Sequence, residues 1–411
     1  MQPALRSVVV VGGGLAGLST CSALRASGFA EDVVLLAAEP HLPYDRPPLS
    51  KEVLTGASTA ADTQLQPEDW YAANAVDVRL GTRAVALRPA ERAVETADGS
   101  TLRADAVVLA TGGTARPLPV PGGGLAHLLR TRDDADRLRA ELVPGARLLV
   151  VGGGLIGAEV ASSAVSLGCE VTLADPDPLP LAGPAGALVA AYLHRQHADA
   201  GVRLVEAGVT ALERRGGAVH ARLGANPVAE EVEADVVLAG IGIVPDEALA
   251  VSAGLDVAGG VLVGPDLRTS IPEVLAVGDV ARPRGYDGPL ARREHWDAAV
   301  RTGEGAAATL LGAEPPAPAA PWFWTDRYGV HVEVAGTVPQ DGVPVLRGDP
   351  ESGSFAVFFL EDGRLAAAVS VGRGPEARAS RRLVDAAAAV GPAQLSDEAV
   401  DLRRLARAVR M

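Results

Sequence analysis

One local pattern occurs twice in this chain of 411 residues, and it restricts the fold more than any other feature. The stretch VVVVGGGLAGLST (residues 8–20) returns as LLVVGGGLIGAEV (residues 148–160). Each copy is an apolar run, a glycine-rich turn and a stretch of small residues typical of a helix. A second apolar run follows each copy, DVVLLAAE (32–39) and CEVTLAD (169–175). The sequence therefore predicts two strand–helix–strand units with parallel strands.

The first copy has the spacing of a dinucleotide-binding turn. Gly12, Gly14 and Gly17 form GxGxxG between the strand and the helix, and Glu39 ends the next strand. The first glycine makes the turn, the second lets the backbone approach a pyrophosphate, and the third permits close strand–helix packing. The helix N-terminus attracts the phosphates, and the acid binds the ribose hydroxyls.

The second copy meets the same test with Gly152, Gly154, Gly157 and Asp175. Two such turns predict two dinucleotides, which favours a flavin together with a pyridine nucleotide. The carboxylate of Asp175 repels a 2′-phosphate, and the following PDPLPLAGP contains no arginine to receive one. This favours NADH over NADPH.

The rest of the chain connects these units and adds a third region. ADAVVLATGG (104–113) predicts a buried strand that ends at Thr111 and Gly112, and EADVVLAGIGIVPDEALA (233–250) repeats that pattern and carries the chain back. GAEPPAPAAP (312–321) is typical of a linker. Seven of the 14 aromatic residues then fall within 322–359, and the alternating run SFAVFFLEDGRLAAAVSV predicts antiparallel strands. DEAVDLRRLARAVRM (397–411) predicts a short, solvated terminal helix in preference to a membrane anchor.

Composition excludes several classes of function. The net charge of −14 argues against non-specific nucleic-acid binding. The two cysteines, Cys21 and Cys169, are far apart and form no CxxC motif or disulfide framework, which indicates a reducing cytoplasm. We expect no signal peptide, no membrane span and no metal site, with His194 and His197 as surface residues.

The stretch PYDRPPLSKEVL (43–54) contains Lys51, the only lysine among 37 lysine and arginine residues. An arginine head group is a bulky planar fork, whereas a lysine ammonium is compact. A site that retains lysine in an arginine-rich chain indicates a need for the smaller cation.

These motifs resemble those of FAD-dependent NADH:ferredoxin reductases of the putidaredoxin reductase and biphenyl dioxygenase ferredoxin reductase type, in the FAD-dependent pyridine nucleotide reductase family. The resemblance covers essentially the whole chain and rests on VVVGGGLAG, PYDRPPLSK, LATGG, VVGGGLIGAEVA, AGIGIVPDEALA, LAVGDVA, REHWDAA and PWFWTDRYG. It implies an α/β fold with two Rossmann-like dinucleotide-binding domains and a C-terminal α+β domain. The implied division is 1–114 and 244–318 for FAD, 115–243 for NAD, and 319–411 for the C-terminal domain.

The resemblance also implies roles for individual residues. Lys51 lies beside the flavin ring, where its ammonium stabilises the reduced form, and Glu159 pairs with it; these two are the catalytic candidates. The implied FAD contacts are Ala16, Glu39, Arg46, Ala84, Arg130, Asp279, Trp296 and Trp324, together with the first glycine turn and the Thr111–Gly112 strand end. The implied NADH contacts are Ile156, Glu159, Asp175 and Gly242, together with the second glycine turn.

The implied activity is electron transfer from NADH through FAD to a [2Fe–2S] ferredoxin, which supplies a cytochrome P450 or a Rieske-type oxygenase. Arg282, Arg284, Arg292 and Arg293 are candidates for docking an acidic ferredoxin, and a monomer or weak homodimer is expected. Alternatives are an NADH oxidase, a reductase of rubredoxin or quinone, and a signalling or nucleic-acid-binding flavoprotein of the apoptosis-inducing-factor type, against which the charge speaks.

Overall fold

The computed structural model describes residues 5–224, 230–285, 288–317 and 319–409. These fall into two units, and each is described on its own. Unit 1 comprises Met1–Asp45, Ala60–Thr114 and Ile243–Pro318, and unit 2 comprises Arg46–Thr59, Ala115–Gly242 and Ala319–Met411. The chain leaves unit 1 after the Thr111–Gly112 strand end and returns to it at Ile243. The division into FAD, NAD and C-terminal domains stays a prediction; Arg46–Thr59, assigned there to the FAD domain, groups with unit 2.

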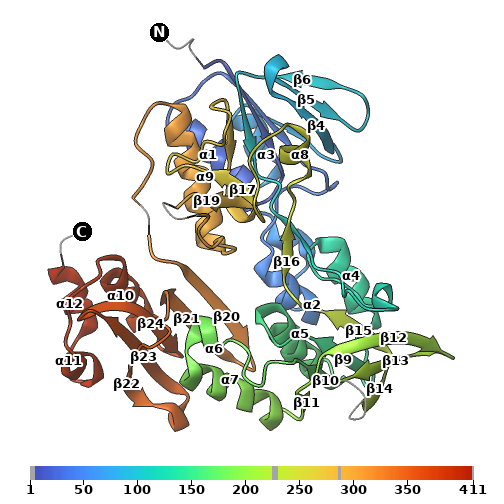
Figure 1. Ribbon diagram of the computed structural model, residues 1–411, viewed down its shortest axis with the longest axis vertical. Helices are drawn as coiled ribbons and strands as arrows, with labels where there is room; N and C mark the ends of the chain where they lie inside the picture. Colours follow the sequence, from blue (N-terminus) through green and yellow to red (C-terminus); the bar gives the residue numbers. More distant parts are fainter. Residues whose placement is uncertain (1–4, 225–229, 286–287, 318, 410–411) are drawn as a thin grey trace. The chain divides into compact units, whose positions relative to one another are not determined.

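Unit 1 is built on a parallel sheet of five strands (Figure 1). The order is β18 (Val274–Ala276), β7 (Ala106–Leu109), β1 (Ser7–Val11), β2 (Asp32–Leu36) and β3 (Val76–Arg79). Both faces of the sheet are covered, as expected for strands that read as continuous apolar runs. Along β1, Val8 and Val10 face the core of one layer, and Val9 and Val11 face the core of the other.

The first layer contains α1 (Leu15–Ala26), α3 (Glu68–Ala73) and α9 (Trp296–Leu310), with α1 and α9 side by side in both ribbon views (Figure 1). The second layer contains α8 (Ala248–Ser252), the antiparallel sheet β4 (Ala84–Arg88), β5 (Ala93–Thr96) and β6 (Thr101–Arg103), and the pair β17 (Val261–Val263) and β19 (Ala281–Pro283). A ribbon of β8 (Gly113–Ala115) and β16 (Ile243–Pro245) is also formed.

Unit 2 contains the second parallel sheet, in the order β11 (Arg203–Val205), β10 (Glu170–Ala174), β9 (Arg147–Val151) and β15 (Val236–Ala239). The antiparallel sheet β12 (Val209–Arg215), β13 (Ala218–Leu223) and β14 (Glu230–Ala234) packs on one of its faces. The helices of this part are α2 (Glu52–Thr55), α4 (Arg132–Glu141), α5 (Leu155–Ser166), α6 (Ala182–Ala185) and α7 (Ala187–Asp199). Both predicted strand–helix–strand units are therefore present.

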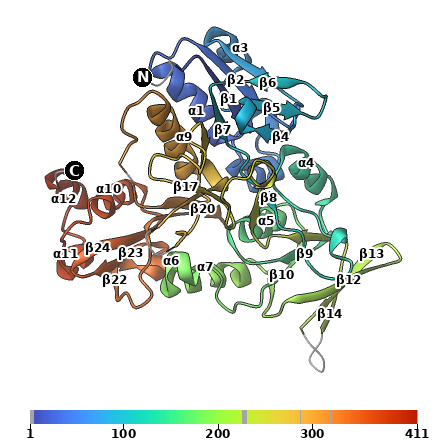
Figure 2. The same cartoon turned by 45° about the horizontal axis from the view of Figure 1, so that its top comes forward.

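The last part of unit 2 is an antiparallel sheet with helices on both sides (Figure 2). Its order is β20 (Trp322–Arg327), β21 (Val330–Gly336), β24 (Arg364–Val371), β23 (Ser354–Glu361) and β22 (Pro344–Asp349). One face packs against α10 (Gly374–Asp385), α11 (Pro392–Ser396) and α12 (Leu402–Ala408), and the other against α6 and α7.

The predicted antiparallel pairing in this sheet is confirmed, but the predicted alternation is wrong. Residues 355–359 of β23 are all buried, because each face of the sheet has its own covering layer. The predicted terminal helix corresponds to α12, whose Leu402 and Ala406 pack into the core while its arginines are exposed. Residues 410–411 of that stretch, and Pro318 of the linker, lie outside the described residues.

Candidate functional site

The three glycines of the first glycine-rich turn, in unit 1, lie in three different environments. These match the tight turn, the open approach and the close helix packing expected from the sequence. Gly12 has a φ of +125°, and a Cβ there would collide with the carbonyl oxygen of Ala110. A Cβ at Gly17 would collide with the carbonyl oxygen of Gly12, so α1 can approach the turn only without a side chain there. Gly14 is the N-cap of α1, and a Cβ at this position would meet no atom within 4 Å. The helix N-terminus is therefore open to a phosphate group.

The second turn, in unit 2, repeats this arrangement. Gly152 has a φ of +101°, and a Cβ there would lie 2.6 Å from the carbonyl oxygen of Gly240. A Cβ at Gly157 would collide with the carbonyl oxygen of Gly152, whereas Gly154, the N-cap of α5, faces open space. The first turn of α5 is also accessible at Ile156, whose side chain is exposed.

The acids that follow the two turns are held in different ways. The Tyr44 hydroxyl donates a hydrogen bond of 2.5 Å to Glu39 Oε2. Asp175 instead accepts hydrogen bonds from the backbone N–H groups of Gly153 (2.6 Å) and Asp177 (2.8 Å). The second acid is thereby fixed beside the turn that it serves. Both turns, with their uncrowded helix N-termini and neighbouring carboxylates, fit the pyrophosphate and ribose of a dinucleotide.

Unit 1 contains ten of the predicted FAD-site residues: Gly12, Gly14, Ala16, Gly17, Glu39, Ala84, Thr111, Gly112, Asp279 and Trp296. Two of them have defined partners near the strand ends. Thr111 Oγ1 donates to the carbonyl oxygen of Asp246 (2.8 Å), and Trp296 Nε1 donates to Asp45 Oδ1 (2.9 Å). Ala84 begins β4 and Ala16 lies within α1.

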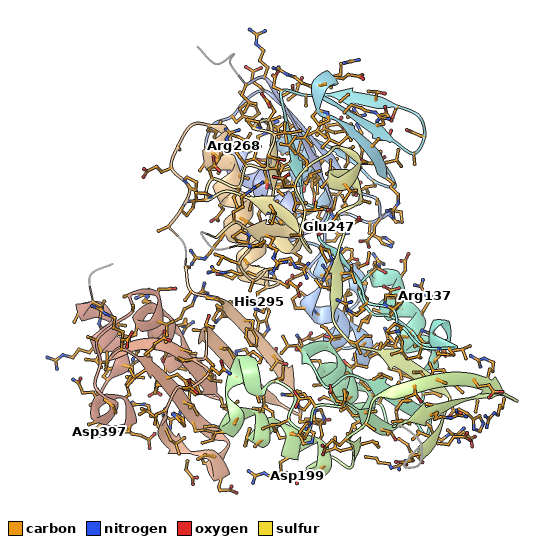
Figure 3. All side chains as sticks on the ribbon, viewed as in Figure 1. Arg137, Asp199, Glu247, Arg268, His295 and Asp397 are labelled. Carbon is orange, nitrogen blue, oxygen red and sulfur yellow. The ribbon has the colours of Figure 1, made fainter. Side chains whose placement is uncertain are left out.

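His295, labelled in Figure 3, is the N-cap of α9 immediately before Trp296. Burial lowers the pKa of His295, and nearby Asp279 acts in the opposite direction. Asp279 itself lies in the short 3₁₀ turn Gly278–Val280, after β18. The Asp279 carboxylate, which is expected at the ribityl chain, therefore acts electrostatically on a partly buried imidazole.

Unit 2 contains the predicted NADH-site residues, namely Gly152, Gly154, Ile156, Gly157, Glu159, Asp175 and Gly242, together with Arg46, Lys51, Arg130 and Trp324 from the predicted FAD set. Gly242 has a φ of +96° and open space where a Cβ would be. Arg46 precedes the 3₁₀ turn Pro47–Ser50, and the backbone N–H of Arg130 donates to Asp134 at the start of α4. The FAD site predicted from the sequence draws on both units and stays a prediction.

The predicted pairing of Lys51 with Glu159 is confirmed. Lys51 Nζ lies 3.3 Å from Glu159 Oε2, and the side chains are 11% and 4% exposed. Lys51 follows the turn Pro47–Ser50, and Glu159 is in the second turn of α5, directly after the glycine-rich turn. The lone lysine thus forms an ion pair with α5, the helix that begins at the second glycine-rich turn.

Glu159 is held by hydroxyl groups as well as by the ammonium. Ser50 Oγ donates to Glu159 Oε2 (2.5 Å), and Thr325 Oγ1 donates to Glu159 Oε1 (2.8 Å). Ser163, one turn further along α5, donates to the carbonyl oxygen of Ser50 (2.7 Å). Three segments that are remote in sequence therefore meet at one buried anion.

A polar cluster that includes Arg327, on which Glu159 acts electrostatically, was not predicted from the sequence. Arg327 is only 4% exposed, and its Nη1 lies 3.3 Å from Nε2 of His197, whose Nδ1 lies 2.7 Å from the Tyr328 hydroxyl. The expectation that His197 is a surface residue is wrong: it is 2% exposed because α7 packs against the sheet that begins with β20. A signal for Arg327 was present, since Thr325 and Arg327 alternate with Trp324 and Asp326 and so share the inner face of β20.

The tryptophans of β20 are partly buried. The Trp322 and Trp324 rings have centroids 5.1 Å apart, and Trp322 also packs against the core of unit 2. Of the two, Trp322 therefore belongs to the edge of the core. The role of Trp324 at the flavin stays a prediction.

Several of the arginines proposed for docking are already engaged. Arg284 pairs with Asp256 (2.8 Å), Arg292 with Glu294 (2.5 Å), and Arg282 Nε donates to the carbonyl oxygen of Leu290 (2.8 Å). A free basic patch at this place is thus not supported by these three side chains. Within the described ranges, no helix is long and apolar enough to cross a bilayer, and no cluster of His, Cys, Asp and Glu could hold a metal ion.

Comparison with known proteins adds the family context. Residues 6–303 match the model of the pyridine nucleotide-disulphide oxidoreductase family, and residues 322–406 match the reductase C-terminal family. The chain is 40% identical to the anthranilate 1,2-dioxygenase system ferredoxin–NAD(+) reductase component of Burkholderia cepacia, over 96% of this chain and 98% of that protein. It is 35% identical to putidaredoxin reductase of Pseudomonas putida, over 98% and 97%. The crystal structure of a covalent putidaredoxin reductase–putidaredoxin complex matches with a TM-score of 0.92 and 35% identity, covering 99% of each chain.

Proposed function

The chain belongs to the pyridine nucleotide-disulphide oxidoreductase family, and on that premise we propose that it is an NADH:ferredoxin reductase. As such a reductase, the protein passes electrons from NADH, through FAD, to a [2Fe–2S] ferredoxin, and that ferredoxin supplies a cytochrome P450 or a Rieske-type oxygenase. Support for the ferredoxin comes from relatives that are named as ferredoxin reductase components of oxygenase systems.

The observation that carries the proposal is the pair of uncrowded glycine-rich turns, each with its own acid at the end of the following strand. One turn per dinucleotide is what a permanent flavin and an exchanging nicotinamide cofactor require. We assign the turn of unit 1, with Glu39 and Asp279, to FAD. The turn of unit 2, with Ile156 and Asp175, is assigned to NADH, since the negative charge of Asp175 repels a 2′-phosphate.

When bound, FAD would supply the chemistry that links a two-electron hydride donor to a one-electron iron–sulfur carrier. The protein groups assigned to this chemistry are Lys51 and Glu159. The compact ammonium of Lys51 supplies positive charge where the flavin ring becomes negative on reduction, and Glu159 holds the ammonium in place. Arg46, Ala84, Arg130, Trp296 and Trp324 complete the proposed FAD site.

The chain does not use the dithiol chemistry that the family name suggests. Its only cysteines, Cys21 and Cys169, are both buried and unpaired, and they lie in different units. Burial raises the pKa of Cys21 to about 12, so its reactive thiolate is scarce at neutral pH. We therefore propose that electrons leave the flavin directly. Two unpaired thiols also support a cytoplasmic location.

The test is NADH consumption by the purified FAD-containing protein in air, with and without a [2Fe–2S] ferredoxin and cytochrome c. We expect slow NADH consumption alone and fast cytochrome c reduction only when the ferredoxin is present. Rapid NADH consumption without ferredoxin would instead assign the chain to the NADH oxidases. Fast turnover with rubredoxin or a quinone, but not with ferredoxin, would assign it to the corresponding reductases.

A further inference from the structure

The negative charge of Glu159 acts on a second cation besides Lys51. Arg327 lies two residues after Thr325 on the inner face of β20, and Glu159 acts electrostatically on its guanidinium. Burial lowers the pKa of Arg327 to about 10, whereas the negative charge of Glu159 raises it. Within the described part of the chain, Nε and Nη2 of Arg327 are buried without a hydrogen-bond partner. Unsatisfied buried donors are rare and call for an explanation.

His197, whose imidazole contacts Arg327, is a neutral hydrogen-bond acceptor and does not neutralise the guanidinium charge. His197 Nε2 lies 3.3 Å from Arg327 Nη1, a group that can only donate, so Nε2 accepts. Nδ1 therefore carries the proton and donates to the Tyr328 hydroxyl (2.7 Å). Burial and the Arg327 charge lower the pKa of His197 to about 3, so it is neutral at physiological pH. Glu159 remains the anion that acts on Arg327.

Among the residues that the structure describes, one further acid of the same unit forms an ion pair with Lys51. Asp326 Oδ2 lies 4.0 Å from Lys51 Nζ, but the Asp326 side chain is 39% exposed. Its other oxygen lies 2.5 Å from Nδ1 of His331. Solvent screening and this second partner weaken its effect on the ammonium. The buried part of the cluster thus has two cations, Lys51 and Arg327, and one carboxylate.

The backbone at Arg327 is held in a strained turn. Tyr328 has a φ of +52°, in the left-handed region that side chains other than glycine seldom adopt. Its N–H donates to Ser162 Oγ (2.8 Å), and its hydroxyl meets His197, so the turn is fixed from α5 and from α7. Such strain persists only where the surrounding contacts enforce it. The contacts here keep Arg327 pointing into the cluster.

We propose that Arg327 is a positioning residue that shares Glu159 with Lys51 and thereby leaves the Lys51 ammonium only partly neutralised. A lysine paired with a carboxylate of its own would add little positive charge to its surroundings. A lysine that shares its carboxylate retains more of its charge, which favours a negatively charged neighbour. The consequence for flavin chemistry rests on the proposed function, whereas the charge sharing itself does not.

The lone lysine makes the charge sharing directly measurable. In full-length, FAD-containing protein labelled with ¹³C and ¹⁵N lysine, Lys51 gives the only lysine side-chain NMR signal. Arg327→Gln removes a like charge, so the ammonium should keep its proton to a pH that is higher by about 0.5 to 1 unit. Arg327→Lys retains a cation and should restore most of the parent behaviour. Arg195→Gln is the matched control, because it removes an exposed arginine from α7 that pairs with Glu351.

A milder substitution covers the case in which Arg327→Gln does not fold. Thr325→Val removes one hydroxyl donor from Glu159 Oε1 and frees that oxygen for the unpartnered N–H groups of Arg327. The Lys51 signal should then titrate at a lower pH than in the parent protein. An unchanged Lys51 titration in the folded Arg327→Gln protein, or a change equal to that of Arg195→Gln, would overturn the proposal. So would an unchanged or raised midpoint in Thr325→Val.

The flavin potential provides the functional readout and separates the two proposals. In Arg327→Gln we expect the FAD midpoint potential to fall and reduction by NADH to slow about three- to tenfold, with the KM for NADH unchanged. If Lys51 titrates as expected but the potential does not move, the charge sharing stands and its effect on the flavin is overturned. Failure of ferredoxin-dependent cytochrome c reduction in the parent protein would overturn only the proposed function.

Discussion

Helices α1 and α5 follow the same glycine-rich turn, and one of the equivalent positions at which they differ has different contacts in each helix. Seven residues after the first glycine, α1 has Ser19 and α5 has Glu159. Ser19 belongs to a close helix–helix contact, since a Cβ on Gly303 of α9 would lie 2.7 Å from Ser19 Cβ. Glu159 is instead a buried anion bound by two hydroxyls and the lone lysine.

This difference distinguishes the shared role of the duplicated pattern, dinucleotide binding, from the contacts that are particular to each copy. The turn and the following acid recur, so they account for dinucleotide binding in both units. The helix position occupied by Ser19 in α1 and by Glu159 in α5 differs between the copies, because its side chain contacts a different neighbour in each unit. In unit 1 it serves packing, and in unit 2 it organises charge.

The largest expected effect comes from removing the charge on α5. Glu159→Gln leaves Lys51 and Arg327 buried without their shared anion, and breaking a buried ion pair in this way costs about 3–5 kcal/mol. We expect the free energy of unfolding, measured with urea, to fall by about 3 kcal/mol. Ser19→Ala is the matched change on α1 and should cost less than about 0.5 kcal/mol. Equal effects of the two substitutions would contradict the contrast between the helices.

The next effect tests the packing side of the comparison. A methyl group at Gly303 would lie 2.7 Å from the carbonyl oxygen of Ala16 and 2.9 Å from the backbone nitrogen of Thr20, so α1 and α9 must separate. Gly303→Ala should destabilise the protein by about 2 kcal/mol and lower its FAD content. In Gly305→Ala, on the same helix, the nearest atom to the new methyl is a flexible leucine methyl group at 3.0 Å, and the proline atoms beyond it, at 3.7 and 3.9 Å, are in ordinary contact. Thermal unfolding should show little change for this control.

Features that depend on neighbouring residues could be predicted from the sequence, whereas contacts between remote segments could not be predicted from residue spacing. The roles of Gly12, Gly17, Gly152 and Gly157 follow from local spacing, and the structure shows the close backbone contacts that this spacing implies. The Lys51–Glu159 pair joins distant segments, and it was predicted from a family resemblance rather than from spacing.

His197 could not be predicted in the same way. Its burial arises because α7 packs on the C-terminal sheet, and no local pattern encodes that contact. For Arg327, the alternation along β20 indicated the inner face but not the partners found there. The alternation predicted for β23 is wrong for a different reason, since residues 355–359 form a continuous apolar run, which is typical of a strand that is covered on both faces.

A smaller effect concerns acid stability. The pKa of His197 is about 3 in the folded protein and about 6.5 when unfolded, so the unfolded chain binds the additional proton. The contribution of neutral His197 to stability is therefore complete above about pH 6.5 and is lost as the pH falls toward 3; at pH 5 the loss is about 2 kcal/mol.

Substitution isolates this contribution from those of other groups. His197→Phe should unfold more easily at neutral pH but lose less stability between pH 7 and pH 5 than the parent protein. His194→Phe, one turn earlier on α7, should keep the parent pH dependence. Urea unfolding at the two pH values provides the measurement, and an unchanged slope in His197→Phe would argue against a buried neutral imidazole.

The smallest expected effect distinguishes the two acids after the glycine turns. Asp175→Asn removes the charge that repels a 2′-phosphate but keeps an oxygen that can accept from Gly153. The ratio of kcat/KM for NADPH to that for NADH should rise about tenfold. Asp177→Asn, an exposed neighbour whose carboxylate accepts from Leu179, should change the ratio by less than about twofold. No change in either variant would remove Asp175 from the nucleotide site.

The most direct test of the role given to the lone lysine is the rate at which NADH reduces the flavin in Lys51→Arg, measured by rapid mixing. The substitution keeps the charge but replaces a compact ammonium with a planar fork that must fit beside Glu159, Ser50 and Thr325. We predict that the variant still binds FAD and that flavin reduction slows by at least about tenfold. Flavin content and reduction rate both equal to those of the parent protein would contradict the account.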